Sequence, residues 1–73
     1  MNRIKVKEEF FKDYEKVESK LKAVNPEYEK IEFEIIPRTG HFLLIANKSD
    51  DLLQKYIFDL CSEPQLFEKI EIF

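Results

Sequence analysis

The residue types that most often perform chemistry are scarce in this sequence. The chain has one histidine, His41, and one cysteine, Cys61, whereas a metal site needs several ligands in convergent geometry. Cys61 falls in an apolar helical stripe, where a cysteine usually behaves as a small buried hydrophobe. His41 follows Gly40. Because Gly40 is the one glycine of the sequence, the chain cannot form a glycine-rich phosphate loop. We therefore expect neither a metal site nor a cofactor.

Arg38 is the one candidate for anion-handling chemistry, because a small enzyme can hold an anion with a single arginine on a loop. Its neighbours offer no activated nucleophile. The acidic pairs Asp50/Asp51 and Glu32/Glu34 fit a helix start and a solvated strand face instead. The sequence thus predicts a protein that is not an enzyme, and a small anion-handling enzyme is the second alternative.

The charged residues are unevenly distributed. Twelve Lys and Arg against fifteen Asp and Glu give a net charge of −3, and residues 1–24 carry a net of +2, which leaves −5 for residues 25–73. Nucleic-acid binding needs a clustered basic surface. An acidic second half suits a basic protein partner better.

The composition predicts one folded domain over residues 1–73, with 44% hydrophobic and 37% charged residues. A single cysteine excludes an internal disulfide, which favours a reducing, cytoplasmic location. We find neither a run of about 18 apolar residues nor the apolar stretch of a signal peptide, and we expect no membrane partner. Ten Lys against two Arg and eight Ile against two Ala are typical of an AT-rich genome, such as that of a low-GC bacterium or its phage.

The hydrophobic period predicts a strand and then a helix in the first third of the chain. Residues 3–6 alternate polar and apolar side chains, although Val6 also extends the helical stripe that follows. A helix is predicted from about Lys7 to Val24, ended by Asn25-Pro26. Its apolar stripe consists of Phe10, Phe11, Tyr14, Val17, Leu21 and Val24.

From Lys30 the period changes to two, which predicts a strand with one solvated face. Its apolar members are Ile31, Phe33 and Ile35, and its acidic members are Glu32 and Glu34. Thr39-Gly40 predicts a hairpin turn. The returning strand, residues 41–46, is apolar at almost every position, which indicates a central strand in the sheet.

The last third of the chain predicts a second helix and a final strand. Ser49 is the expected N-cap, followed by an inward stripe of Leu52, Leu53, Tyr56, Ile57, Leu60 and Cys61. Pro64 stops the helix. A strand is then predicted over residues 66–73, with Glu68, Ile70 and Ile72 on one side and Phe67, Lys69, Glu71 and Phe73 on the other.

The predicted order βαββαβ indicates an α/β (α+β) fold. With right-handed crossovers it forms a ferredoxin-like plait, a four-stranded antiparallel sheet in the order 4-1-3-2 with two helices on one face. If residues 3–6 were helical, the alternative would be an αββαβ layer with three strands.

A plait leaves one sheet face without helices, and this face is the predicted binding surface. With Thr39 and Gly40 as the only loop residues, Ile36 lies opposite Leu43, while alternate residues such as Leu44 point toward the helices. Arg3, Lys5, His41, Phe67 and Lys69 are also expected on this face. The predicted partner-binding residues are Glu32, Glu34, Ile36, Leu43, Ile45, Glu71 and Phe73.

Apolar residues rimmed by charge are typical of a protein contact. The sequence therefore predicts a protein-binding module that contacts a partner, or its own copy, through this face or an edge strand. Its acidity favours an inhibitor or immunity-type protein acting on a basic, nucleic-acid-handling partner. The alternative is an RNA- or DNA-binding plait, whose third-strand pattern residues 40–45 faintly resemble; the exposed aromatic residues of such domains are missing here.

Overall fold

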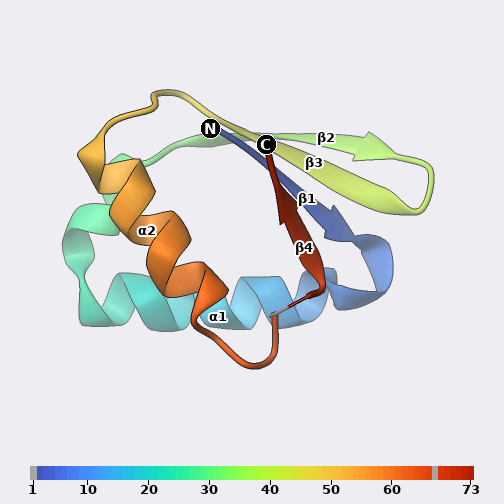
Figure 1. The fold of residues 1–73 in the computed structure, drawn as a ribbon, viewed down its shortest axis with the longest axis horizontal. Helices are drawn as coiled ribbons and strands as arrows, with labels where there is room; N and C mark the ends of the chain where they lie inside the picture. Colours follow the sequence, from blue (N-terminus) through green and yellow to red (C-terminus); the bar gives the residue numbers. More distant parts are fainter. Residues whose placement is uncertain (1, 67) are drawn as a thin grey trace.

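The strands and α-helices follow one another in the order βαββαβ in the computed structural model, which describes residues 2–66 and 68–73 (Figure 1). The elements are β1 (Arg3–Lys7), α1 (Phe11–Val24), β2 (Phe33–Arg38), β3 (His41–Ala46), α2 (Asp51–Cys61) and β4 (Ile70–Ile72). Two short 3₁₀ helices, η1 (Glu8–Phe10) and η2 (Pro26–Lys30), lie before and after α1.

The four strands form one sheet in the order β2-β3-β1-β4, and all neighbouring strands are antiparallel. Both α-helices lie on the same side of the sheet (Figure 1). The predicted plait is therefore confirmed. The alternative αββαβ arrangement is wrong, because residues 3–7 form β1 between β3 and β4.

The hairpin that joins β2 and β3 has the predicted register. Arg38 pairs with His41 and Ile36 pairs with Leu43, so Thr39 and Gly40 are the only turn residues. Gly40 has φ of +79°, a left-handed conformation that glycine adopts without steric cost. This turn sets which side chains of both strands face the helices.

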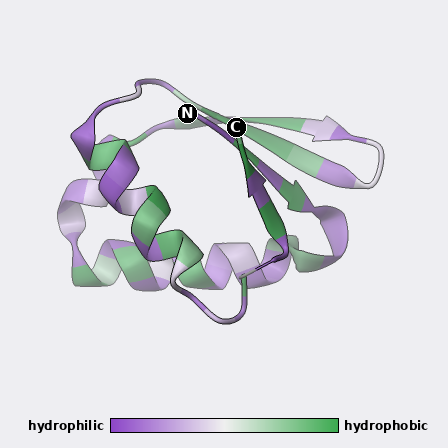
Figure 2. Ribbon diagram, in the orientation of Figure 1, coloured by the Kyte–Doolittle hydropathy of each residue, from purple (hydrophilic) through white to green (hydrophobic). Residues whose placement is uncertain are grey.

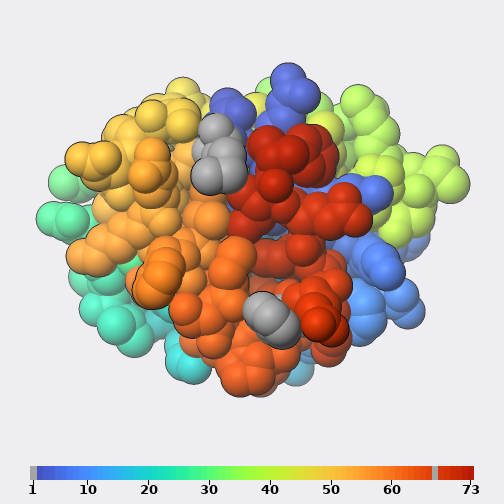
Figure 3. All heavy atoms as spheres, viewed as in Figure 1, coloured from blue at the N-terminus to red at the C-terminus, as the bar shows by residue number. Residues whose placement is uncertain are grey.

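The core lies between the sheet and the helical layer. In Figure 2 hydrophobic and hydrophilic bands alternate along both helices, as expected for elements buried on one side. The space-filling view shows the C-terminal residues beside α2 and against the N-terminal strand (Figure 3). The buried side chains are Ile4, Val6, Tyr14, Val17, Leu21, Tyr28, Ile31, Leu44, Ala46, Leu53, Tyr56, Leu60 and Leu66.

The first helix differs from the prediction at both ends. It begins at Phe11 rather than near Lys7, because η1 makes a tighter turn between β1 and α1. Val24 is 77% exposed, although it continues the predicted stripe. It is the last residue of α1 and is left exposed there, so its inward placement was wrongly predicted.

The N-cap of α2 is Asp50, so the prediction of Ser49 is wrong by one residue. The Asp50 carboxylate accepts a hydrogen bond of 3.1 Å from the Leu53 N–H. This start directs Leu53, Tyr56 and Leu60 into the core, as the predicted stripe requires.

The last strand is shorter than predicted. β4 covers only Ile70–Ile72, and Glu68 has φ of +71°, which is incompatible with a strand. Leu66 is buried in the core instead of belonging to the strand. The placement predicted for Phe67 lies outside the described residues.

Within the described part of the chain, neither α-helix has the length and apolar composition that crossing a membrane requires.

Candidate functional site

The candidate site is the side of the sheet opposite the helices, here called the open face. Residues paired directly across antiparallel strands project from the same side of the sheet. Because Ile4, Val6 and Leu44 are buried on the helix side, their neighbours along each strand project from the open face. The open-face residues are Arg3, Lys5, Lys7, Glu34, Ile36, Arg38, His41, Leu43, Ile45, Glu71 and Phe73.

The apolar side chains of the open face lie mainly on β2 and β3. Ile36 and Leu43 are a direct cross-strand pair, and Ile45 lies two residues along β3 from Leu43. All three are half-buried although no helix of the described residues covers this side. The structure thus brings together three of the predicted binding residues.

Phe73 belongs to the open face but is separated from the other apolar residues. Arg3 and Phe73 exchange two backbone hydrogen bonds, of 3.1 and 3.0 Å. Arg3 also pairs with Ile45 on its other side. The Arg3 side chain therefore stands between Phe73, which is 50% exposed, and Ile45.

The basic residues of the open face lie mainly on the central strand β1. Arg3, Lys5 and Lys7 all project there from β1, and Arg38 lies at the turn end of β2. We find the acidic residues at the margins, with Glu34 on β2 opposite Ile45 and Glu71 on β4 opposite Lys5.

The carboxylates of the open face are therefore outnumbered by basic groups. Glu71 is also partly compensated, because the Lys5 Nζ lies 4.0 Å from its Oε2. Exposed ion pairs of this kind contribute little to stability. It follows that the acidic excess of residues 25–73 is not concentrated on the predicted binding surface.

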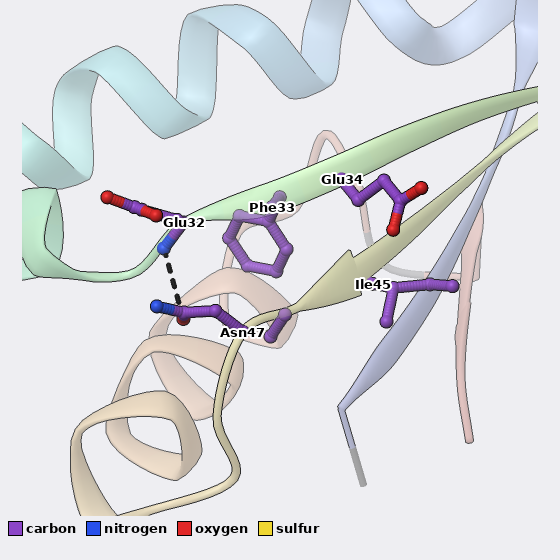
Figure 4. Close-up of a pocket in the computed structure, with 6 residues that line it drawn as sticks. Glu32, Phe33, Glu34, Ile45 and Asn47 are labelled. Carbon is purple, nitrogen blue, oxygen red and sulfur yellow. Dashed lines mark hydrogen bonds between the residues drawn. The ribbon is translucent and has the colours of Figure 1, made fainter.

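Glu32 immediately precedes β2 and lies at the rim of a shallow hollow of about 300 Å³. Its N–H donates a hydrogen bond of 3.3 Å to the Asn47 Oδ1. Figure 4 shows the Glu32 and Glu34 side chains projecting in different directions. The carboxylates beside this hollow thus do not converge on one point, as the polar groups of a substrate pocket do. The hollow is lined by Glu32, Phe33, Glu34, Ile45, Ala46 and Asn47.

Of the residues considered for chemistry, Arg38 and His41 are a cross-strand pair at the hairpin turn, whereas Cys61 lies apart from them. The His41 Nδ1 is 3.2 Å from the Thr39 carbonyl oxygen at the turn, on the open face. Cys61 lies at the end of α2, on the helical side, where burial raises the pKa of its thiol. Among the described residues, His, Cys, Asp and Glu form no group of three suited to a metal ion.

Three buried tyrosines form polar contacts that the hydrophobic periods did not predict. The hydroxyl oxygens of Tyr14 and Tyr56 are 3.1 Å apart, and the Tyr28 hydroxyl donates to the Asp59 carboxylate. Burial raises the pKa of Tyr14 and of Tyr56, so both hydroxyls stay protonated. We interpret these contacts as structural, because they satisfy hydroxyls that the core encloses.

Comparison of this chain with protein-family models, with curated proteins and with solved structures finds no match.

Proposed function

We propose that this protein is a small, non-enzymatic binding module that docks onto another protein through the open face. The observation that carries the proposal is the apolar cluster of Ile36, Leu43 and Ile45 on two adjacent strands, on the side of the sheet opposite both α-helices. Covering apolar side chains releases about 25 cal/mol per Å² of apolar surface. A cluster rimmed by charge is the usual form of a protein contact.

The charges around this cluster favour an acidic partner surface. Arg3 and Lys5 lie directly beside Ile45 and Leu43, and Arg38 lies near Ile36. Complementary charge steers association and disfavours wrong partners. We therefore propose an acidic partner, in place of the basic partner that the sequence composition favoured.

Nucleic-acid binding is a second candidate, favoured by Arg3, Lys5 and Lys7 on the central strand β1. Plait domains that bind RNA stack bases on aromatic side chains of the central strands. The described open-face positions of β1 and β3 carry no Phe or Tyr, and Phe42 points toward Phe11 on the helical side, with 4.3 Å between ring centroids. For this reason we propose a protein partner ahead of a nucleic acid.

The test uses peptides selected from a random display library on the immobilised protein. We expect the selected peptides to be rich in Asp, Glu and apolar residues. Leu43→Glu should weaken their binding about tenfold or more, since it places a charge in the apolar cluster. Val24→Glu is the matched control, because it makes the same change at a side chain that is 77% exposed on α1.

Two results would overturn this proposal. Selected peptides that bind the Leu43→Glu variant as tightly as the unmodified protein would exclude the apolar cluster as the contact. Tight binding of single-stranded poly(U) RNA that falls steeply with salt and weakens in Lys5→Gln would favour the nucleic-acid function instead. Circular dichroism of each variant verifies that the fold is kept.

A further inference from the structure

Strand β2 leaves one edge of the sheet unpaired. It is the first strand in the order β2-β3-β1-β4, so among the described strands it pairs with β3 alone and its other edge has no strand partner. The Asn47 N–H donates to the Glu32 carbonyl, and backbone groups alternate along an antiparallel ladder. It follows that Phe33, Ile35 and Pro37 direct their backbone groups away from β3.

Proline blocks only part of this free edge. Pro37 lies near the turn and has no N–H, which is a common protection of edge strands. The N–H groups of Phe33 and Ile35 are not blocked in this way. The half of β2 farther from the turn can therefore accept another strand.

Ile35 is the second feature of this edge. It projects toward the helix side of the sheet, and its cross-strand neighbour Leu44 is 1% exposed. Ile35 itself is 50% exposed, because β2 is the outermost strand of the sheet. A large apolar side chain thus stands beside an unpaired backbone edge.

We propose that β2 pairs antiparallel with the β2 of a second copy, about a two-fold axis at Ile35, to form one continuous sheet across a dimer. In this register each Glu32 lies opposite Arg38 of the other copy, and the two Ile35 side chains meet. The Phe33 N–H donates to the Pro37 carbonyl of the other copy. Opposite charges placed directly across strands stabilise such pairing.

Other registers are less favourable. An axis at Glu34 would place two glutamates directly opposite each other, which is destabilising. An axis at Ile36 would keep an acid opposite Arg38, but it would move Phe33 opposite Thr39 of the turn and leave it without a strand partner. Only the axis at Ile35 uses the donors of both Phe33 and Ile35 in strand pairs without placing like charges opposite each other.

Edge pairing also agrees better with the charges than dimerisation through the open face. Two copies placed face to face would bring the basic side chains of the central strand β1, Arg3, Lys5 and Lys7, close to the same groups of the other copy. Pairing through β2 leaves the open face accessible. The dimer proposal is therefore independent of the proposed partner and can be tested separately.

Analytical ultracentrifugation of the full chain is the first test. The shared edge is short, so we expect a weak dimer, and concentrations from about 10 µM to about 1 mM should be compared. Ile35→Lys should raise the dimer dissociation constant about tenfold or more. Val24→Lys and Leu43→Glu are controls that should leave it unchanged, the first on α1 and the second on the open face.

Charge reversal and cross-linking test the register. Arg38→Glu should weaken the dimer several-fold, and adding Glu32→Arg should restore it. In a Cys61→Ser background, Ile35→Cys should form an intermolecular disulfide on mild oxidation, because Cα atoms of such a pair lie about 5.5 Å apart. Glu34→Cys, whose side chain is on the other side of the sheet, should not.

A chain that stays monomeric throughout this concentration range overturns the proposal. Loss of the dimer in Leu43→Glu but not in Ile35→Lys would mean that copies associate through the open face. Faster cross-linking through Ile36→Cys than through Ile35→Cys overturns the register.

Discussion

Tyr14 and Tyr56 join the two helices through a hydrogen bond inside the core. Each side chain is 1% exposed, and the hydroxyl oxygens are 3.1 Å apart. The Tyr56 ring also packs edge-on against Tyr28, at 5.2 Å between centroids. One hydroxyl donates and the other accepts, so each satisfies a polar group that water reaches poorly.

We predict that these two hydroxyls are coupled in stability. Tyr14→Phe leaves the Tyr56 hydroxyl without this partner and should lower the free energy of unfolding by about 1 to 2 kcal/mol. The double variant with Tyr56→Phe should lose less free energy of unfolding than the sum of the two single losses, because it leaves neither hydroxyl buried without its partner. Urea unfolding of all four proteins measures the coupling, and strictly additive losses would contradict it.

At the residue scale, the sequence predicts positions in regular elements better than positions between them. Leu43 and Ile45 could be placed on the open face because the two-residue turn at Gly40 sets the register. Tyr28 could not be placed in the core, since the five residues of η2 are too few to show a hydrophobic period. The buried position of Tyr28 depends on contacts with residues distant in the chain.

At the scale of one element, the start of α2 depends on the charge of Asp50. The hydrogen bond from the Leu53 N–H holds the pKa of the Asp50 carboxyl below its ordinary value of 3.8, and nearby Lys48 lowers it further. The folded state therefore favours the ionised carboxylate. Its contribution to stability is present above the ordinary pKa and is lost as the pH falls through the lowered pKa.

Asp50→Asn tests this charge dependence, because asparagine caps a helix equally well but does not ionise. We expect the unmodified protein to be more stable than the variant at pH 7. The difference should shrink as the pH is lowered to about 2. Thermal unfolding of both proteins across this range measures it, and a difference independent of pH would show that the charge of Asp50 is not involved.

The residues before β4 show that a local hydrophobic pattern does not determine where a strand begins. Alternation over residues 66–73 predicts a strand more than twice as long as the three residues that pair with β1. The pattern contains no information on the left-handed conformation of Glu68. Leu66 is apolar in either case, and only the packing of the chain shows that it fills the core.

At the scale of the whole molecule, topology decides how the charges are shared between surfaces. The order of strands places β1 between β3 and β4, so its basic side chains enter the middle of the open face. Composition alone gives an acidic protein of net charge −3. The apolar residues of the candidate site, and Arg3 and Lys5 beside them, could thus be predicted from the sequence. The basic character of the face also depends on Lys7 and Arg38, which the assembled strands place there.

The two backbone hydrogen bonds between Arg3 and Phe73 hold the first and last strands side by side, which allows the order of the chain to be changed. A linker of about four glycine and serine residues from Phe73 to Asn2 should span this junction, and new ends could be opened between Lys48 and Ser49, which are exposed. We predict that this circular permutant folds with the far-ultraviolet dichroism of the original chain and unfolds in one cooperative transition. A permutant that stays unstructured would contradict the prediction. Success would mean that the first and last strands of the chain can be joined covalently without disturbing the architecture.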